Sequence, residues 1–299
     1  MSAAINVMAP TSNYMRCAGR EIHYMEWGAG NTPTVIAWHG LARTARDMDE
    51  LAAHLSAPSM GYRVICPDTI GRGLSQWSPD PGREYCLAFY TLLATALVDQ
   101  LDLDTFHWVG TSMGGAIGLV AAAGSLRGRI ERLVLNDNGP SLAAAAIARI
   151  RSYAGSPAAF ATVSELEQYF RSIYAPYGQL SDAQWRRLTE SSVRRLPDGR
   201  VTPHYDPAMV QQFVTRPADY ERWAEWDALD IPVLCLRGET SDLLLRETTE
   251  QMRQRGPRAV VVEIAGSGHA PAQNTPEQFA LVERFLAGDA AHADSLATA

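Results

Sequence analysis

The chain has 299 residues, of which 46% are apolar and 20% are charged, and its formal net charge is −7. This composition is typical of a globular protein with a sizeable core, built as one large domain with an insertion or as two small domains. Acidic and basic residues are interspersed along the chain, which argues against nucleic acid or an anionic membrane surface as a partner. Because no apolar run reaches about 18 residues and no signal peptide is recognisable, we expect a cytoplasmic protein that does not enter the membrane.

The first half of the chain alternates between apolar, strand-like runs and amphipathic stretches. We expect strands at residues 13–17, 21–27, 33–38, 62–66, 106–109 and 132–136. Helices are expected between them at 44–56, 85–101 and 116–123. This regular alternation predicts an α/β fold with a doubly wound, mostly parallel sheet, to which the opening hairpin adds an antiparallel edge.

The alternation stops near residue 140 and resumes near residue 228. From 141 to 226 the sequence indicates helices and no convincing strand, and both Ser164 with Glu167 and Ser181 with Gln184 have the spacing of a capping box. Strands are expected again at 231–236 and 258–264, before a last helix that begins after Thr275. We therefore expect an α/β core formed by residues 1–139 and 228–299, with residues 140–227 inserted as a helical cap over the carboxyl edge of the sheet.

A sharp turn between a strand and a helix carries the first chemical motif. Gly110-Thr111-Ser112-Met113-Gly114 fits the pattern G-x-S-x-G, the nucleophile elbow. A serine on so tight a turn adopts a strained backbone conformation and needs neighbours without bulk, which the glycines provide. The motif therefore predicts Ser112 as a nucleophile raised above the sheet.

A serine nucleophile needs a base, and the base needs an anion that fixes its tautomer. Among the seven histidines, His269 lies on a glycine-flanked loop after the last expected strand, from which its ring could reach Ser112. His39 also ends a strand near the site, but it opens a loop whose backbone it more plausibly shapes. We therefore predict His269 as the general base.

The sequence offers more than one carboxylate as the anion that pairs with His269. Asp242 follows the strand just before the one that leads to His269, which favours it as the partner of that histidine. Asp137 ends the strand after the elbow and is the alternative, although it also fits a local turn in Asn136-Asp137-Asn138-Gly139. Glu239 is a weaker third candidate.

Two backbone N–H groups are candidates for an oxyanion hole. Met113 begins the helix after the elbow, so its N–H points toward the place where an oxyanion would form. A second donor should come from the loop after the first parallel strand. In His39-Gly40-Leu41 the N–H of Leu41 is the best placed, because Gly40 lets the backbone turn toward the reacting oxygen.

The motifs together resemble those of the α/β-hydrolase superfamily with a helical cap, and serine carboxylesterases and enol-lactonases are the most similar members. The matching segments are His39-Gly40-Leu41, Asp68-x-x-Gly71-x-Gly73-x-Ser75, Gly110 to Gly115, Arg237-Gly238-x-x-Ser241-Asp242 and Gly268-His269-Ala270-Pro271. The resemblance implies Ser112 as nucleophile, His269 as base, Asp242 as acid, and Leu41 with Met113 as oxyanion donors. It does not identify the substrate-binding residues.

These features favour hydrolysis of a small, largely apolar carboxylic ester or lactone through an acyl-enzyme on Ser112. The alternatives are hydrolysis of a C–C bond in a β-diketone or ring-fission product, acyl transfer or perhydrolysis, and more remotely a receptor that captures a small molecule without turnover. We expect no cofactor and no metal, because no metal-ligand or dinucleotide motif is present. The oligomeric state is left open, a homodimer included.

Overall fold

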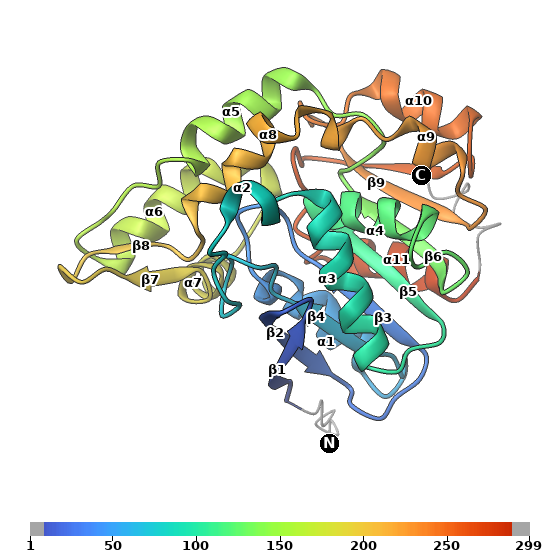
Figure 1. Cartoon of the computed structure of the whole chain (residues 1–299), viewed down its shortest axis with the longest axis horizontal. Helices are drawn as coiled ribbons and strands as arrows, with labels where there is room; N and C mark the ends of the chain where they lie inside the picture. The colour runs from blue at the N-terminus through green and yellow to red at the C-terminus, as the bar shows by residue number, and fades with distance from the viewer. Residues whose placement is uncertain (1–8, 289–299) are drawn as a thin grey trace.

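The computed structural model describes residues 9–288 of the chain, and within them one sheet of eight strands forms the centre of the molecule (Figure 1). The strand order is β1-β2-β4-β3-β5-β6-β9-β10. The strands are β1 (Thr11–Cys17), β2 (Arg20–Trp27), β3 (Thr34–Trp38), β4 (Arg63–Pro67), β5 (Phe106–Thr111), β6 (Ile130–Asn136), β9 (Val233–Gly238) and β10 (Val260–Ile264). β2 pairs antiparallel with β1 and β4, whereas the other pairs are parallel, which confirms the predicted α/β sheet with an antiparallel edge.

The central strands are buried on both faces because apolar residues occupy successive positions. In β3, Ile36 and Trp38 belong to one core cluster, whereas Val35 and Ala37 belong to a second cluster on the opposite face. Since side chains of a strand alternate between faces, a continuous apolar run supplies both cores at once. The indole rings of Trp38 and Trp108 stack at 5.3 Å between centroids and join neighbouring strands.

Helices cover each face of the sheet (Figure 1). α3 (Leu87–Gln100) and α4 (Met113–Ala123) contribute to the first core cluster, and α1 (Asp49–Ser56) and α11 (Pro276–Leu286) contribute to the second. α10 (Arg246–Gln254) lies between β9 and β10 in sequence. No helix within residues 9–288 combines the length and the apolar character needed to cross a bilayer.

The segment from residue 140 to 227 contains α5 (Ala144–Ala154), α6 (Val163–Ile173), α7 (Asp182–Glu190) and α9 (Trp223–Asp227), with the short α8 (Gln212–Thr215) between them. It also contains a hairpin of β7 (Val193–Arg195) and β8 (Val201–Pro203), so the expectation of no strand here is wrong. Each strand has only three residues, too few to produce a clear alternating pattern. This segment has its own core of five buried residues, Leu166, Phe170, Tyr174, Trp185 and Val201.

The capping boxes in this segment agree only in part with the sequence pattern. Ser181 and Gln184 form the predicted box at the start of α7. The box at the start of α6 is made by Thr162 and Glu165, two residues before the predicted pair Ser164 and Glu167. Both pairs have the same spacing, so only the position at which the backbone becomes helical distinguishes them.

Candidate active site

Ser112 lies on the turn between β5 and α4, in the strained conformation that the motif predicts. Its φ is 52° and its ψ is −117°, which is unusual for a residue other than glycine. The flanking glycines are required by close backbone contacts. A Cβ on Gly110 would lie 2.3 Å from the carbonyl oxygen of Gly114, and a Cβ on Gly114 would lie 2.2 Å from that of Trp38. Any larger residue at either position would therefore displace the turn that presents Ser112.

The imidazole of His269 binds the carboxylate of Asp137. The Nδ1–H group donates to Asp137 Oδ2 at 2.7 Å, and the Asp137 side chain is completely buried. The same carboxylate accepts the Gly238 N–H at 2.8 Å and the Ser241 hydroxyl at 2.6 Å. Three donors thus compensate the loss of water around this buried carboxylate and hold it in one orientation.

Asp242, the favoured acid, does not contact His269. Its carboxylate binds the guanidinium of Arg149 and its side chain is 55% exposed. β6 and β9 are neighbouring parallel strands, with Asn136 opposite Leu236. The loops that follow these two strands, which carry Asp137 and Asp242, therefore begin close together. Asp137 follows β6 directly, whereas Asp242 comes four residues after the end of β9, where the loop has turned away. The third candidate, Glu239, binds the Gly266 N–H instead.

Ser112 and His269 line one pocket, together with residues from the core and from α5 and α6. The other residues that line this pocket are Gly40, Leu41, Ala42, Arg43, Thr111, Arg149, Ile150, Tyr153, Ile173, Tyr174, Pro176, Tyr177 and Ala270. In the described part of the chain no hydrogen bond joins the Ser112 hydroxyl to the His269 ring; such contacts often tighten only when substrate binds. The structure therefore brings the predicted nucleophile and base to one cavity, with Asp137 behind the base.

The loop after β3 passes directly beside Ser112. A Cβ on Gly40 would lie 3.6 Å from the Cβ of Ser112. Two side chains fix the backbone of this loop by hydrogen bonds. Arg72 donates to the carbonyl oxygen of Leu41 at 2.8 Å, and His39 Nδ1 donates to the carbonyl oxygen of Gly40 at 2.6 Å. Burial lowers the pKa of His39 to about 4, so this ring is neutral and its Nε2 accepts the Thr69 N–H at 2.9 Å. His39 therefore shapes the backbone of this loop, as predicted from its position after the strand.

The segment from Asp68 to Ser75 supports this loop and does not enter the pocket. Asp68 accepts the N–H groups of Ala45 and Leu74 at 2.7 and 2.9 Å. It also accepts His23 Nδ1 at 2.7 Å. Burial raises the pKa of the Asp68 carboxyl, but these hydrogen bonds outweigh it and leave the pKa below its ordinary value. A Cβ on Gly73 would lie 2.2 Å from the same carboxylate, which explains the glycine in the motif.

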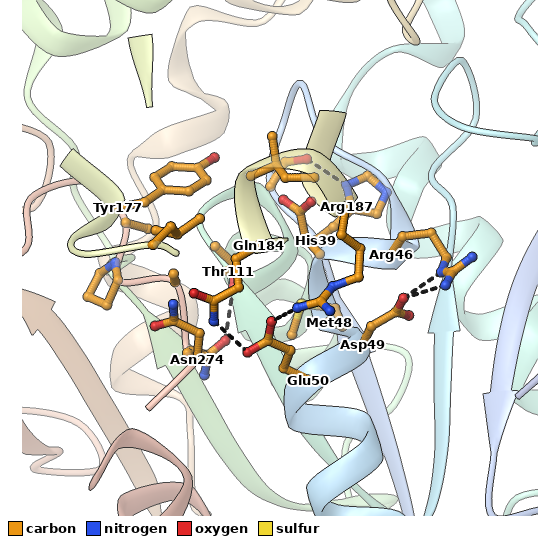
Figure 2. Close-up of a pocket in the computed structure, with 18 residues that line it drawn as sticks. His39, Arg46, Met48, Asp49, Glu50, Thr111, Tyr177, Gln184, Arg187 and Asn274 are labelled. Carbon is orange, nitrogen blue, oxygen red and sulfur yellow. Dashed lines mark hydrogen bonds and ion pairs between the residues drawn. The ribbon is translucent and has the colours of Figure 1, made fainter. Parts of the chain in front are cut away.

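A second pocket adjoins the first and shares Gly40, Thr111, Tyr177 and Ala270 with it. The residues that line this second pocket are drawn in Figure 2. One wall is polar and joins the core to the inserted segment. Glu50 of α1 accepts Gln184 Nε2 at 2.9 Å and also binds Arg187, both from α7. Asp49, beside Glu50, pairs with Arg46, yet burial raises the pKa of its carboxyl to about 6.

The sequence did not identify the residues of the inserted segment that line the pocket containing Ser112 and His269. Arg149 and Tyr153 come from α5, whereas Tyr174 and Tyr177 follow α6. The tyrosines stood out only as aromatic residues of a helical region, where most such residues form a local core. Arg149 belongs to no sequence motif, because its place in the pocket depends on how α5 packs against the core.

The fold and this site define a hydrolase with a strand–serine–helix elbow, a histidine–aspartate pair and an inserted, mainly helical segment. Residues 35–281 match the model of the Alpha/beta hydrolase family, and the chain belongs to that family.

Two curated relatives and one solved structure illustrate the similarity. The 3-hydroxybutyrate-oligomer hydrolase of Cupriavidus necator is 37% identical over 294 residues, 94% of this chain and 99% of its own. The 2-hydroxy-6-oxo-2,4-heptadienoate hydrolase of Pseudomonas putida is 33% identical over 138 residues, 44% of this chain and 45% of its own. An alpha/beta hydrolase structure from Novosphingobium aromaticivorans has a TM-score of 0.82 and 32% identity, and the match covers 93% of this chain and 98% of that one.

Proposed function

We propose that this protein hydrolyses a carboxylic ester through an acyl-enzyme formed on Ser112. His269 takes the hydroxyl proton as the oxygen attacks the ester carbonyl, and Asp137 stabilises the resulting imidazolium. The observation that carries this proposal is the 2.7 Å hydrogen bond from His269 to the buried carboxylate of Asp137, beside the pocket that Ser112 lines.

The N–H groups of Leu41 and Met113 would stabilise the tetrahedral oxyanion. Met113 occupies the first turn of α4, where N–H groups have no acceptor within the helix. The Leu41 N–H lies on the loop that Gly40 brings against Ser112. Collapse of the intermediate breaks the ester C–O bond, and His269 returns the proton to the leaving alcohol. A water molecule, activated by the same ring, then releases the acid and regenerates Ser112.

We propose short oligoesters of a hydroxy acid, with 3-hydroxybutyrate oligomers as the first to test, as the substrate class. The Cupriavidus necator relative, which matches 94% of this chain, is named for that substrate. The pocket also differs from the one we expected for a largely apolar ester, because its lining includes two arginines and three tyrosines. Residues 140–227, which supply Arg149 and these tyrosines, would act as the cap that determines specificity.

The experiment is to incubate the protein with the dimer and trimer of 3-hydroxybutyrate and to quantify the monomer by liquid chromatography. We expect turnover by the wild type and by Ser125→Ala, an exposed serine used as the control. Ser112→Ala should lose activity by more than about 10³-fold. Equal turnover by the wild type and Ser112→Ala would contradict the acyl-enzyme mechanism.

Hydrolysis of a C–C bond is the second candidate, supported by the match to 2-hydroxy-6-oxo-2,4-heptadienoate hydrolase over 138 residues. That match covers less than half of either chain. Incubation with a vinylogous β-diketone, followed by product analysis, distinguishes the two candidates. C–C cleavage would release a carboxylic acid and a ketone from the diketone. If these products form faster than alcohol is released from any ester tested, C–C cleavage is favoured.

A further inference from the structure

Arg149 lies at the wall of the catalytic pocket and carries an exposed positive charge. It belongs to α5 and lines the pocket together with Ser112 and His269. Its guanidinium binds Asp242 through both ends, with Nη2–Oδ1 at 2.8 Å and Nε–Oδ2 at 3.1 Å. The side chains of Arg149 and Asp242 are 48% and 55% exposed.

The described residues that line this pocket include two arginines and no aspartate or glutamate. Arg43 is the other arginine, and its charge is already paired with a carboxylate, although its Nη1 has no hydrogen-bond partner among the described residues. It is buried, it binds both carboxylate oxygens of Asp47 at 2.6 and 2.7 Å, and its guanidinium lies 4.7 Å from the ring centroid of Tyr174. Arg149 differs from Arg43 in that its ion pair with Asp242 is exposed to solvent.

The ion pair between Arg149 and Asp242 is weak enough to be exchanged. Ion pairs between exposed side chains contribute between about 0 and 1 kcal/mol to the free energy of unfolding, because water screens the charges and ordering two long side chains costs entropy. The planar guanidinium offers paired N–H donors that match any carboxylate equally well. A carboxylate that enters the pocket with a substrate can thus take the place of Asp242.

We propose that Arg149 binds the free carboxylate of the substrate and that Asp242 holds the guanidinium in place until the substrate arrives. This proposal rests on the proposed function, because an oligoester of a hydroxy acid always ends in one free carboxylate. In the dimer of 3-hydroxybutyrate that group is on the leaving alcohol, separated from the ester oxygen by two carbon atoms. Arg149 is then a specificity residue that distinguishes acidic esters from neutral ones.

The test compares the 3-hydroxybutyrate dimer with its methyl ester, in which the carboxylate is neutralised and the scissile ester is unchanged. Steady-state kinetics are measured for the wild type, Arg149→Gln, Asp242→Asn and Arg151→Gln. Arg151 is the matched control, because it is an exposed arginine on the same helix that does not line the pocket. Monomer release is followed by chromatography at low and high salt.

Arg149→Gln should raise KM for the free acid by about 10-fold or more and leave KM for the methyl ester within about twofold. Asp242→Asn should change KM for the free acid by less than about threefold, because it removes at once the anion that positions the guanidinium and the anion that competes with the substrate. Added salt should raise KM for the acid in the wild type but not in Arg149→Gln. Arg151→Gln should behave like the wild type.

Two results would overturn the inference while leaving the proposed function intact. Equal losses in Arg149→Gln and Asp242→Asn, on both substrates, would show that the ion pair only fastens α5 to the core. An unchanged KM for the free acid in Arg149→Gln would show that the carboxylate binds elsewhere. If the wild type cleaves neither substrate, the proposed function fails and this inference fails with it.

Discussion

His269 Nδ1 lies 2.7 Å from Asp137 Oδ2, although the two residues are 132 positions apart in the chain. We predict that Asp137→Asn lowers kcat by about 10⁴-fold, because an amide can no longer hold the imidazole in the required tautomer. Asp242→Asn should stay within about threefold of the wild type on a neutral ester, since an exposed pair contributes little. Both variants are compared with a p-nitrophenyl ester, and circular dichroism checks their folding. A larger loss in Asp242→Asn than in Asp137→Asn would reverse the assignment.

The oxyanion role of Leu41 depends on its backbone and not on its side chain. Leu41→Pro removes the N–H group, and we expect kcat to fall by about 10²-fold or more. Leu41→Met keeps the N–H and most of the buried volume, so its kcat should stay within about threefold. Thermal unfolding of each variant separates a local effect from general destabilisation. If Leu41→Pro folds and retains wild-type kcat, the second donor must be a different group.

Gly114 is required because the elbow lies too close to the end of β3 to leave room for a side chain. Because its Cβ would lie 2.2 Å from the Trp38 carbonyl oxygen, Gly114→Ala should destabilise the protein by about 3 kcal/mol and lower activity. Gly82→Ala is the control, since its Cβ would meet no atom closer than 3.9 Å. Urea unfolding followed by tryptophan fluorescence measures both variants. Equal stabilities would show that the elbow can shift without cost.

The buried carboxyl of Asp49 makes stability depend on pH. Burial, partly offset by Arg46, raises its folded pKa to about 6 from an ordinary value of 3.8. Between these two pKa values the folded state holds a proton that the unfolded state has lost, so the free energy of unfolding falls as pH rises. The whole of this loss of stability is present above about pH 6.

Asp49→Asn removes this penalty. We expect the variant to be more stable than the wild type at pH 8 by on the order of 1 kcal/mol, and equally stable near pH 3.5. Denaturant unfolding at several pH values measures the difference. A variant that is less stable than the wild type at pH 8 would show that the ion pair with Arg46 outweighs burial.

Local patterns were sufficient to predict the eight strands of the sheet and the residues whose roles depend on their own neighbours. The apolar run of β3 predicts a strand buried on both faces, and the glycines around Ser112 predict a tight turn. The structure identifies the atoms that leave no room for side chains at those glycines, namely the carbonyl oxygens of Trp38 and Gly114. The same local reasoning missed β7 and β8, where three residues a strand are too few for a pattern.

The sequence by itself determined the chain order of the eight sheet strands, the serine on its turn, and a histidine on a loop after the last strand. Only the tertiary structure decided which carboxylate that histidine contacts and which arginine reaches the pocket. β6 and β9 lie side by side, so Asp137 and Asp242 start from neighbouring strand ends, and a difference of a few loop residues separates a buried partner of His269 from an exposed partner of Arg149. Propensity and spacing describe interactions along the chain, whereas these contacts join segments about a hundred residues apart, and packing alone brings them together.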